Sequence, residues 1–132
     1  MAKSGLILKE FSKLNLQKDE YVIFGSGPMA IHGIKETNDL DVLVKKEVFE
    51  KLKSKYNQNN SHPFGCIVIG NLEIGDNWQG DYEIVEKWIS EAEEVEGYMF
   101  MPLSYVIEWK RMMGRDKDLK DIKIIEDFLK RN

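Results

Sequence analysis

Two aspartates separated by a single residue, Asp39 and Asp41, are the side chains in this sequence whose type and spacing point most directly to chemistry. They lie in the stretch 39–44, where the apolar residues alternate as in a strand with one buried face, so both carboxylates share the other face. Paired carboxylates repel each other when both are ionised, and a divalent cation relieves that repulsion. Hard oxygen ligands of this kind suit Mg²⁺, so the pair predicts a metal site. The competing interpretation is the solvated face of an edge strand, which is disfavoured because aspartate is depleted in strands.

A glycine–serine turn, Gly25-Ser26, precedes the aspartates. It follows an apolar strand at 21–24 and leads into a short helix, in which Pro28 occupies the first turn and Gly33 marks the end. The free N–H groups and the positive dipole end of a helix start bind anions, and glycine permits close approach of a phosphate. A plain strand–helix turn is the alternative. Next to paired carboxylates, the turn predicts a nucleoside triphosphate site.

The order of these motifs resembles the nucleotidyltransferase superfamily, which includes the DNA polymerase beta-like enzymes and the antibiotic nucleotidyltransferases. The residues that carry the resemblance are the turn and the Asp-x-Asp strand within 21–44, with weaker similarity to about Asp127. The sequence is most similar to small, single-domain bacterial members. The resemblance implies a mixed sheet rather than a doubly wound parallel one.

The resemblance also implies a third carboxylate on a later strand. Glu73, flanked by apolar residues, is favoured for this role, and Asp76 remains the alternative. Asp39, Asp41 and Glu73 would then hold one or two Mg²⁺ ions. Glu73 would in addition serve as the general base that activates an acceptor hydroxyl.

Several further residues are candidates for binding the nucleotide. Lys35 precedes the aspartates in a polar loop and can contact phosphate, with a solvated surface lysine as the alternative. The resemblance makes Lys110 and Lys117 candidates for phosphate binding, with Asp118 orienting one of them, although a solvated helix–turn–helix with ordinary ion pairs carries equal weight. Two roles are possible for Trp78: stacking on a base, or packing in the core or at its rim.

The pattern of apolar residues and turn signals defines the expected elements. Helices are expected at 4–16, 28–33, 46–56, 81–92, 102–113 and from 116 to near 131, and strands at 21–24, 39–44, 64–69, 72–76 and 97–101. A polar loop is expected at 57–63, and a cluster of glutamates between 91 and 96 is expected to close the helix before it. This order predicts an α/β (α+β) fold, a small mixed sheet flanked by helices. We expect one domain, 1–132, with its core at 21–76 and C-terminal helices at 102–131.

The composition sets limits on the class of protein. Hydrophobic residues make up 42% and charged residues 32%, as in an ordinary globular domain. A net charge of −4 argues against a general nucleic-acid-binding surface, though not against a local basic groove. The single cysteine, Cys66, excludes an internal disulfide and is expected to be a buried thiol. With no membrane-length apolar run and no signal-peptide pattern, a cytoplasmic protein with no membrane partner is expected.

The function expected from these features is Mg²⁺-dependent transfer of a nucleoside monophosphate from an NTP, with ATP as first choice, to a hydroxyl acceptor. The acceptor is open: a tRNA, a protein or a small molecule, in one version within a toxin–antitoxin module. The last two helices, a homodimer partner or a second polypeptide would supply the acceptor site. Two alternatives remain, a non-catalytic nucleotide-binding module and a structural domain that shares the fold.

Overall fold

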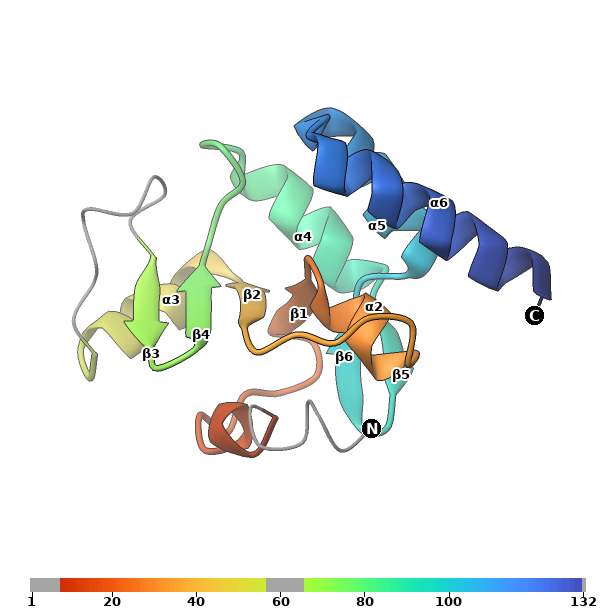
Figure 1. Cartoon of the computed structure of the whole chain (residues 1–132). Coiled ribbons are helices and arrows are strands. Elements are labelled where there is room, and N and C mark those ends of the chain that lie inside the picture. Colours follow the sequence, from red (N-terminus) through yellow and green to blue (C-terminus); the bar gives the residue numbers. More distant parts are fainter. Residues whose placement is uncertain (1–7, 57–65, 132) are drawn as a thin grey trace.

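A six-stranded mixed β-sheet forms the centre of the protein, in a computed structural model that describes residues 8–56 and 66–131 (Figure 1). The strands are β1 (Tyr21–Phe24), β2 (Leu40–Val44), β3 (Ile67–Ile69), β4 (Leu72–Gly75), β5 (Glu93–Val95) and β6 (Tyr98–Phe100). They are arranged in the order β3-β4-β2-β1-β6-β5. The pairs β2–β4 and β1–β6 are parallel, and the other three pairs are antiparallel. The prediction of a small mixed sheet is confirmed.

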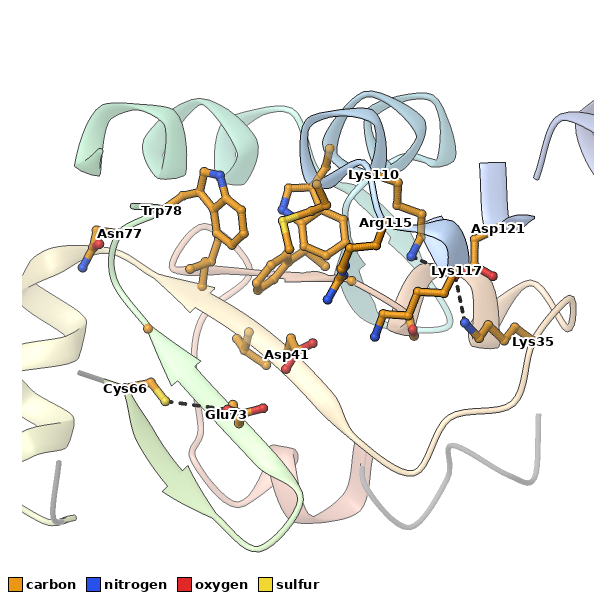
Figure 2. A pocket seen from close by; sticks show the side chains of 18 residues that line it. Lys35, Asp41, Cys66, Glu73, Asn77, Trp78, Lys110, Arg115, Lys117 and Asp121 are labelled. Atoms are coloured by element: carbon orange, nitrogen blue, oxygen red, sulfur yellow. Dashed lines mark hydrogen bonds and ion pairs between the residues drawn. The ribbon is translucent and has the colours of Figure 1, made fainter. Parts of the chain in front are cut away.

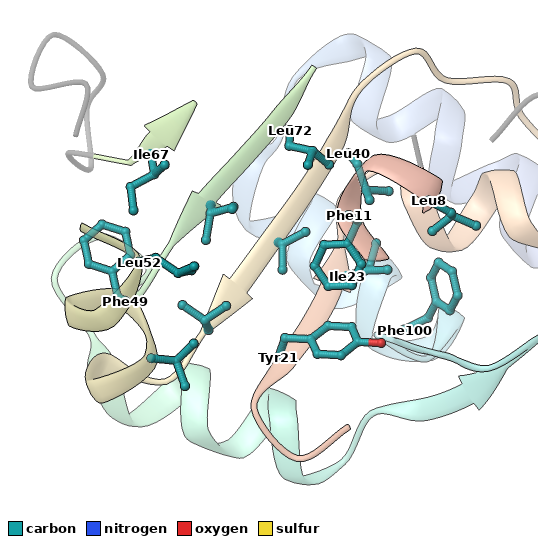
Figure 3. Packing of buried hydrophobic residues seen from close by; sticks show 14 of the residues in the cluster. Leu8, Phe11, Tyr21, Ile23, Leu40, Phe49, Leu52, Ile67, Leu72 and Phe100 are labelled. Carbon is teal, nitrogen blue, oxygen red and sulfur yellow. The ribbon is translucent and has the colours of Figure 1, made fainter. Parts of the chain in front are cut away.

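Helices cover both faces of this sheet. They are α2 (Gly27–Ile31), α3 (Lys46–Lys53), α4 (Tyr82–Ser90), α5 (Leu103–Met113) and α6 (Asp116–Arg131), preceded by a helical turn at 8–12. Helices α4, α5 and α6 lie together on one side of the sheet (Figure 1). The turn at 8–12 and α3 pack on the opposite face (Figure 3). The sheet therefore separates two hydrophobic cores.

The alternation of residues along each strand assigns side chains to these two cores. In β1, Ile23 enters the core shown in Figure 3, whereas Val22 and Phe24 enter the core beneath α4–α6. In β2, the side chains that enter the core shown in Figure 3 are those expected to share one face, Leu40, Val42 and Val44. Leu43 shares the face of the aspartates but is buried under α4–α6. Helices therefore cover part of the face of β2 that carries Asp41. The alternation of residues within the strand did not predict this cover.

One prediction holds only in part. Glu91 does close α4 as its C-cap after Ser90, but the next glutamates do not belong to a helix end, because Glu93–Val95 forms the edge strand β5, paired antiparallel with β6. Glu96 and Gly97, both with positive φ, make the two-residue turn of this hairpin. Both glutamates of β5 are exposed, so pairing with β6 does not bury a carboxylate. Local propensity, which disfavours glutamate in strands, is overridden by this pairing.

Some sequence predictions fall outside the described residues: the polar loop at 57–63, the start of the helix 4–16 and the start of the strand 64–69. Over 8–56 and 66–131, no helix combines the length and the apolar character needed to cross a membrane.

Candidate active site

A cavity of about 410 Å³ opens on the α4–α6 side of the sheet (Figure 2). Its floor comes from β2 and β4, and its walls come from α5, α6, the turn after β1 and the segment after β4. The predicted site residues that line it are Gly25, Ser26, Lys35, Asp41, Glu73, Lys110 and Lys117. Residues drawn from four separate parts of the sequence therefore meet around one space.

Asp41 and Glu73 form the acidic side of the cavity. The parallel register of β2 and β4 places them directly opposite each other, and their neighbours Val42 and Ile74 point into the core on the other face. Side chains in register on adjacent strands lie close together on the same face of a sheet. The two carboxylates are therefore held side by side by the backbones of two buried strands.

Gly25 packs against Asp41. Its φ is +71°, and a Cβ atom added there would lie 2.8 Å from Oδ2 of Asp41. Only glycine provides both the backbone angle and the close approach without strain. Ser26, the residue before α2, does not cap its helix with its side chain. Because α2 has only five residues, any binding of an anion at this turn would depend on its N–H groups and hydroxyl more than on a helix dipole.

The two other candidate carboxylates lie elsewhere. Asp39 is exposed just before β2 and does not belong to the cavity lining. Asp76 is buried at the end of β4, where its Oδ1 accepts a hydrogen bond of 3.0 Å from Nδ2 of Asn77. Glu73, and not Asp76, thus lies beside Asp41. In the described part of the chain, no three acidic, histidine or cysteine side chains gather closely enough to hold a metal ion by themselves.

The basic side of the cavity is organised around Asp121 of α6. Its Oδ2 accepts hydrogen bonds from Lys35 Nζ at 2.8 Å and from Lys110 Nζ at 3.0 Å. Lys110 is only 3% exposed, so this contact is a buried ion pair. Burial acts to raise the pKa of Asp121, but the hydrogen bonds and charges of the two lysines outweigh it and hold the pKa below the ordinary value. Asp121 is therefore an ionised anchor for both lysines.

Arg115 and Asp118 extend this network at the start of α6. Arg115 donates to Asp118 through Nε at 2.6 Å and through Nη2 at 3.2 Å, and Lys110 lies 3.6 Å from the same carboxylate. Burial again acts to raise the pKa of Asp118, and Arg115 and Lys110 together bring it below its usual value. This side of the cavity has four cations, which are Lys35, Lys110, Arg115 and Lys117. Its two carboxylates are Asp118 and Asp121. This side therefore keeps excess positive charge.

Aromatic side chains form the third wall. Phe24, Trp78 and Trp109 line the cavity and contact one another edge to face, with ring centroids 5.5 Å apart for Phe24–Trp109 and 5.6 Å for Trp78–Trp109. The Nε1 atom of Trp109 is buried without a hydrogen-bond partner among the described residues. Trp78 lies at the rim and is half-buried.

Cys66 lines the cavity beside the acids, and its thiol donates a hydrogen bond of 3.8 Å to Oε1 of Glu73. Burial, together with the negative charge of Glu73, raises the pKa of Cys66 to about 11. The thiol is therefore neutral at pH 7. The expectation of a buried free thiol is confirmed, but its place next to Glu73 was not expected.

Sequence reasoning missed Arg115, Asp121 and Cys66 as residues of this cavity. For Asp121 a signal was available, because Asp118 and Asp121 are three residues apart on α6 and so lie on one helix face. Two acids on a face that packs against a lysine-bearing helix indicate a buried ion pair. For Cys66, the Gly70-Asn71 turn between the strands expected at 64–69 and 72–76 indicated a hairpin, which brings its segment beside the strand of Glu73.

Comparisons with known proteins bear on the fold. No protein-family model matches the sequence, and no curated protein matches it either. A crystal structure from Thermotoga maritima, of a "putative nucleotidyltransferase", superimposes with a TM-score of 0.56. The match covers 96% of this chain and 92% of the other at 20% sequence identity. The chain therefore has a nucleotidyltransferase-like fold, and at this identity the likeness concerns the fold alone.

Proposed function

We propose that the protein is a Mg²⁺-dependent nucleotidyltransferase that moves a nucleoside monophosphate from an NTP to a hydroxyl group. One observation carries the proposal. A single cavity has Asp41 and Glu73 side by side on its floor, and a cluster of lysines faces them across it (Figure 2). This arrangement suits a polyphosphate neutralised partly by protein cations and partly by a metal ion. The fold supports the same class of reaction.

The donor set fits Mg²⁺. This ion is commonly held by one or two protein carboxylates, and its remaining positions are filled by substrate phosphates and water. Asp41 and Glu73 supply two carboxylates, which is why a third close ligand within the chain is not required. Bound there, Mg²⁺ would supply charge stabilisation to the triphosphate. Asp39 lies exposed just before β2 and outside the cavity lining, so its contribution to metal binding is tested separately from that of Asp41.

The chain's own groups have distinct roles in the proposed reaction. The acceptor oxygen attacks the α-phosphorus of the NTP, the bond to the bridging oxygen breaks, and pyrophosphate leaves. Glu73 takes the proton of the acceptor hydroxyl. Lys110, Lys35 and Lys117 stabilise the negative charge of the leaving pyrophosphate, and the N–H groups of Gly25-Ser26 bind phosphate oxygens. ATP is the first NTP to test, and a tRNA, a protein and a small molecule are the acceptor classes to test.

Calorimetric titration of the four NTPs tests the proposal, with Mg²⁺ and with EDTA. Wild type is compared with the Asp41→Asn/Glu73→Gln double variant and with Glu47→Gln, which removes an exposed charge on α3. We expect Mg²⁺-dependent binding that the double variant loses and the control retains. Transfer is then followed with α-labelled and γ-labelled NTP, and only the α label should become attached to an acceptor. Metal-independent binding, or equal binding by the double variant, would contradict the assignment.

A further inference from the structure

Trp78 occupies a place in the cavity that neither phosphate nor metal binding uses. It is half-buried at the rim, on the opposite side from Lys35 and Asp121 (Figure 2). Its ring contacts Phe24 at a centroid distance of 6.2 Å and Trp109 at 5.6 Å. The buried rings of Phe24 and Trp109 thus support an indole that keeps part of its surface open.

The backbone holds this indole in place. Trp78 and Asp81 exchange two backbone hydrogen bonds, of 3.1 and 2.9 Å, around a two-residue turn in which Gln79 and Gly80 both have positive φ. Asn77 closes the turn from the other side by accepting a hydrogen bond of 2.9 Å from Gly80 N. A side chain fixed in this way loses little conformational entropy when a ligand packs on it.

The surroundings of Trp78 suit the flat, apolar face of a ligand rather than a specific pattern of hydrogen-bonding groups. The charged side chains of the cavity lie with the acidic pair or with the Asp121 network. Asn77, the polar neighbour in sequence, has its Oδ1 engaged with Gly80 and its Nδ2 engaged with Asp76. This wall therefore offers aromatic side chains and few hydrogen-bonding groups to distinguish one base edge from another.

Resting on the proposed function, we propose that Trp78 is the stacking platform for the nucleobase and that it accepts all four bases with little discrimination. A base that stacks there would extend away from the acids and lysines, which bind the triphosphate. Every base has a π face, so all four bases can stack on an indole. Purines gain more binding free energy than pyrimidines because they bury more area. The cavity volume of about 410 Å³ is within the range of roughly 300–1,000 Å³ typical of small-molecule sites.

The test separates the base from the triphosphate. Dissociation constants of ATP, GTP, CTP, UTP and inorganic triphosphate are measured in Mg²⁺ for wild type, Trp78→Leu, Trp78→Phe and Trp88→Phe. Leucine keeps apolar bulk without a π face, phenylalanine keeps the π face, and Trp88 contacts Trp78 without lining the cavity. Thermal unfolding is measured for each variant, and a cooperative transition establishes that the variant is folded.

We expect wild type to bind ATP on the order of tenfold more tightly than inorganic triphosphate, with the four NTPs within about tenfold of one another. Trp78→Leu should bring ATP close to triphosphate and leave triphosphate itself unchanged. Trp78→Phe and Trp88→Phe should retain most of the ATP preference. Equal binding of ATP and triphosphate by wild type, an unchanged preference in Trp78→Leu, or strong selection of one base overturns this inference while leaving the triphosphate site intact. Binding of none of these ligands overturns the proposed function and the platform with it.

Discussion

Replacement of Asp121 by asparagine tests the buried network most directly. The carboxylate oxygen that accepts from both Lys35 and Lys110 becomes part of a neutral amide. Lys110, 3% exposed, then keeps Asp118 as its remaining ionic partner, at 3.6 Å. An insufficiently neutralised charge in the interior is costly, so Asp121→Asn should destabilise the fold.

The magnitude follows from burial. Removing one partner of a fully buried ion pair costs roughly 3–5 kcal/mol. Here the Lys35 side chain is 35% exposed and Asp118 remains in place, which reduces the expected loss in unfolding free energy to about 2–3 kcal/mol. For a chain of this size that corresponds to a decrease in Tm of roughly 6–12 °C.

Differential scanning calorimetry at pH 7 measures this difference. The matched control is Glu126→Gln, which removes the exposed pair between Glu126 and Arg111 at 3.4 Å on the same two helices. An exposed pair contributes about 0–1 kcal/mol, so the control should lose far less stability than Asp121→Asn. A Tm for Asp121→Asn as high as that of Glu126→Gln would refute the buried network. The double variant Lys110→Met/Asp121→Leu should recover stability, since apolar residues can replace a buried pair.

The pH dependence has a definite sign. The pKa of Asp121 is below its ordinary value, because the two lysines outweigh the effect of burial. Its stabilising contribution is thus fully present above the unfolded pKa, about 3.9, and is lost as the pH falls through the folded value. The difference in unfolding free energy between wild type and Asp121→Asn should therefore be constant from pH 5 to pH 7 and should shrink below about pH 4. The same difference at pH 3 and pH 7 would show that the Asp121 charge is not involved.

The remaining predictions concern the acidic side of the cavity. Gly25→Ala should lose transfer activity and about 1–2 kcal/mol of unfolding free energy, because its Cβ would approach Asp41 and its φ is positive; wild-type kcat would contradict this close approach. Asp41→Asn should reduce kcat by at least two orders of magnitude, and by more than Asp39→Asn does, because of these two aspartates only Asp41 lines the cavity. A larger loss of kcat in Asp39→Asn would place the metal ion near Asp39, outside the cavity. Glu73→Gln should reduce kcat more than Asp76→Asn, whose effect should be on Tm; a larger kcat loss in Asp76→Asn would make Asp76 the third carboxylate.

Much of the site could be predicted because its parts are local. The alternation in 39–44 is enough to put Asp41 on the face opposite Val42, and Gly25-Ser26 before Pro28 is enough to predict a turn into a helix. The alternation of strands and helices, with the resemblance that the motifs carry, predicted a mixed sheet. Each of these inferences uses residues within a few positions of each other, where backbone geometry alone fixes the relation.

Contacts between distant segments were decided only by the tertiary structure. The period of a strand says which face Glu73 occupies, but its pairing with Asp41 depends on β4 docking parallel to β2. Likewise, Lys35 meets Asp121 across 86 positions of sequence because α6 packs over the loop before β2. Edge strand β5 forms because β6 offers a free backbone edge, which outweighs the low strand propensity of its glutamates. Such pairings depend on which buried surfaces fit together, and that information is spread over the whole chain rather than held in any one stretch.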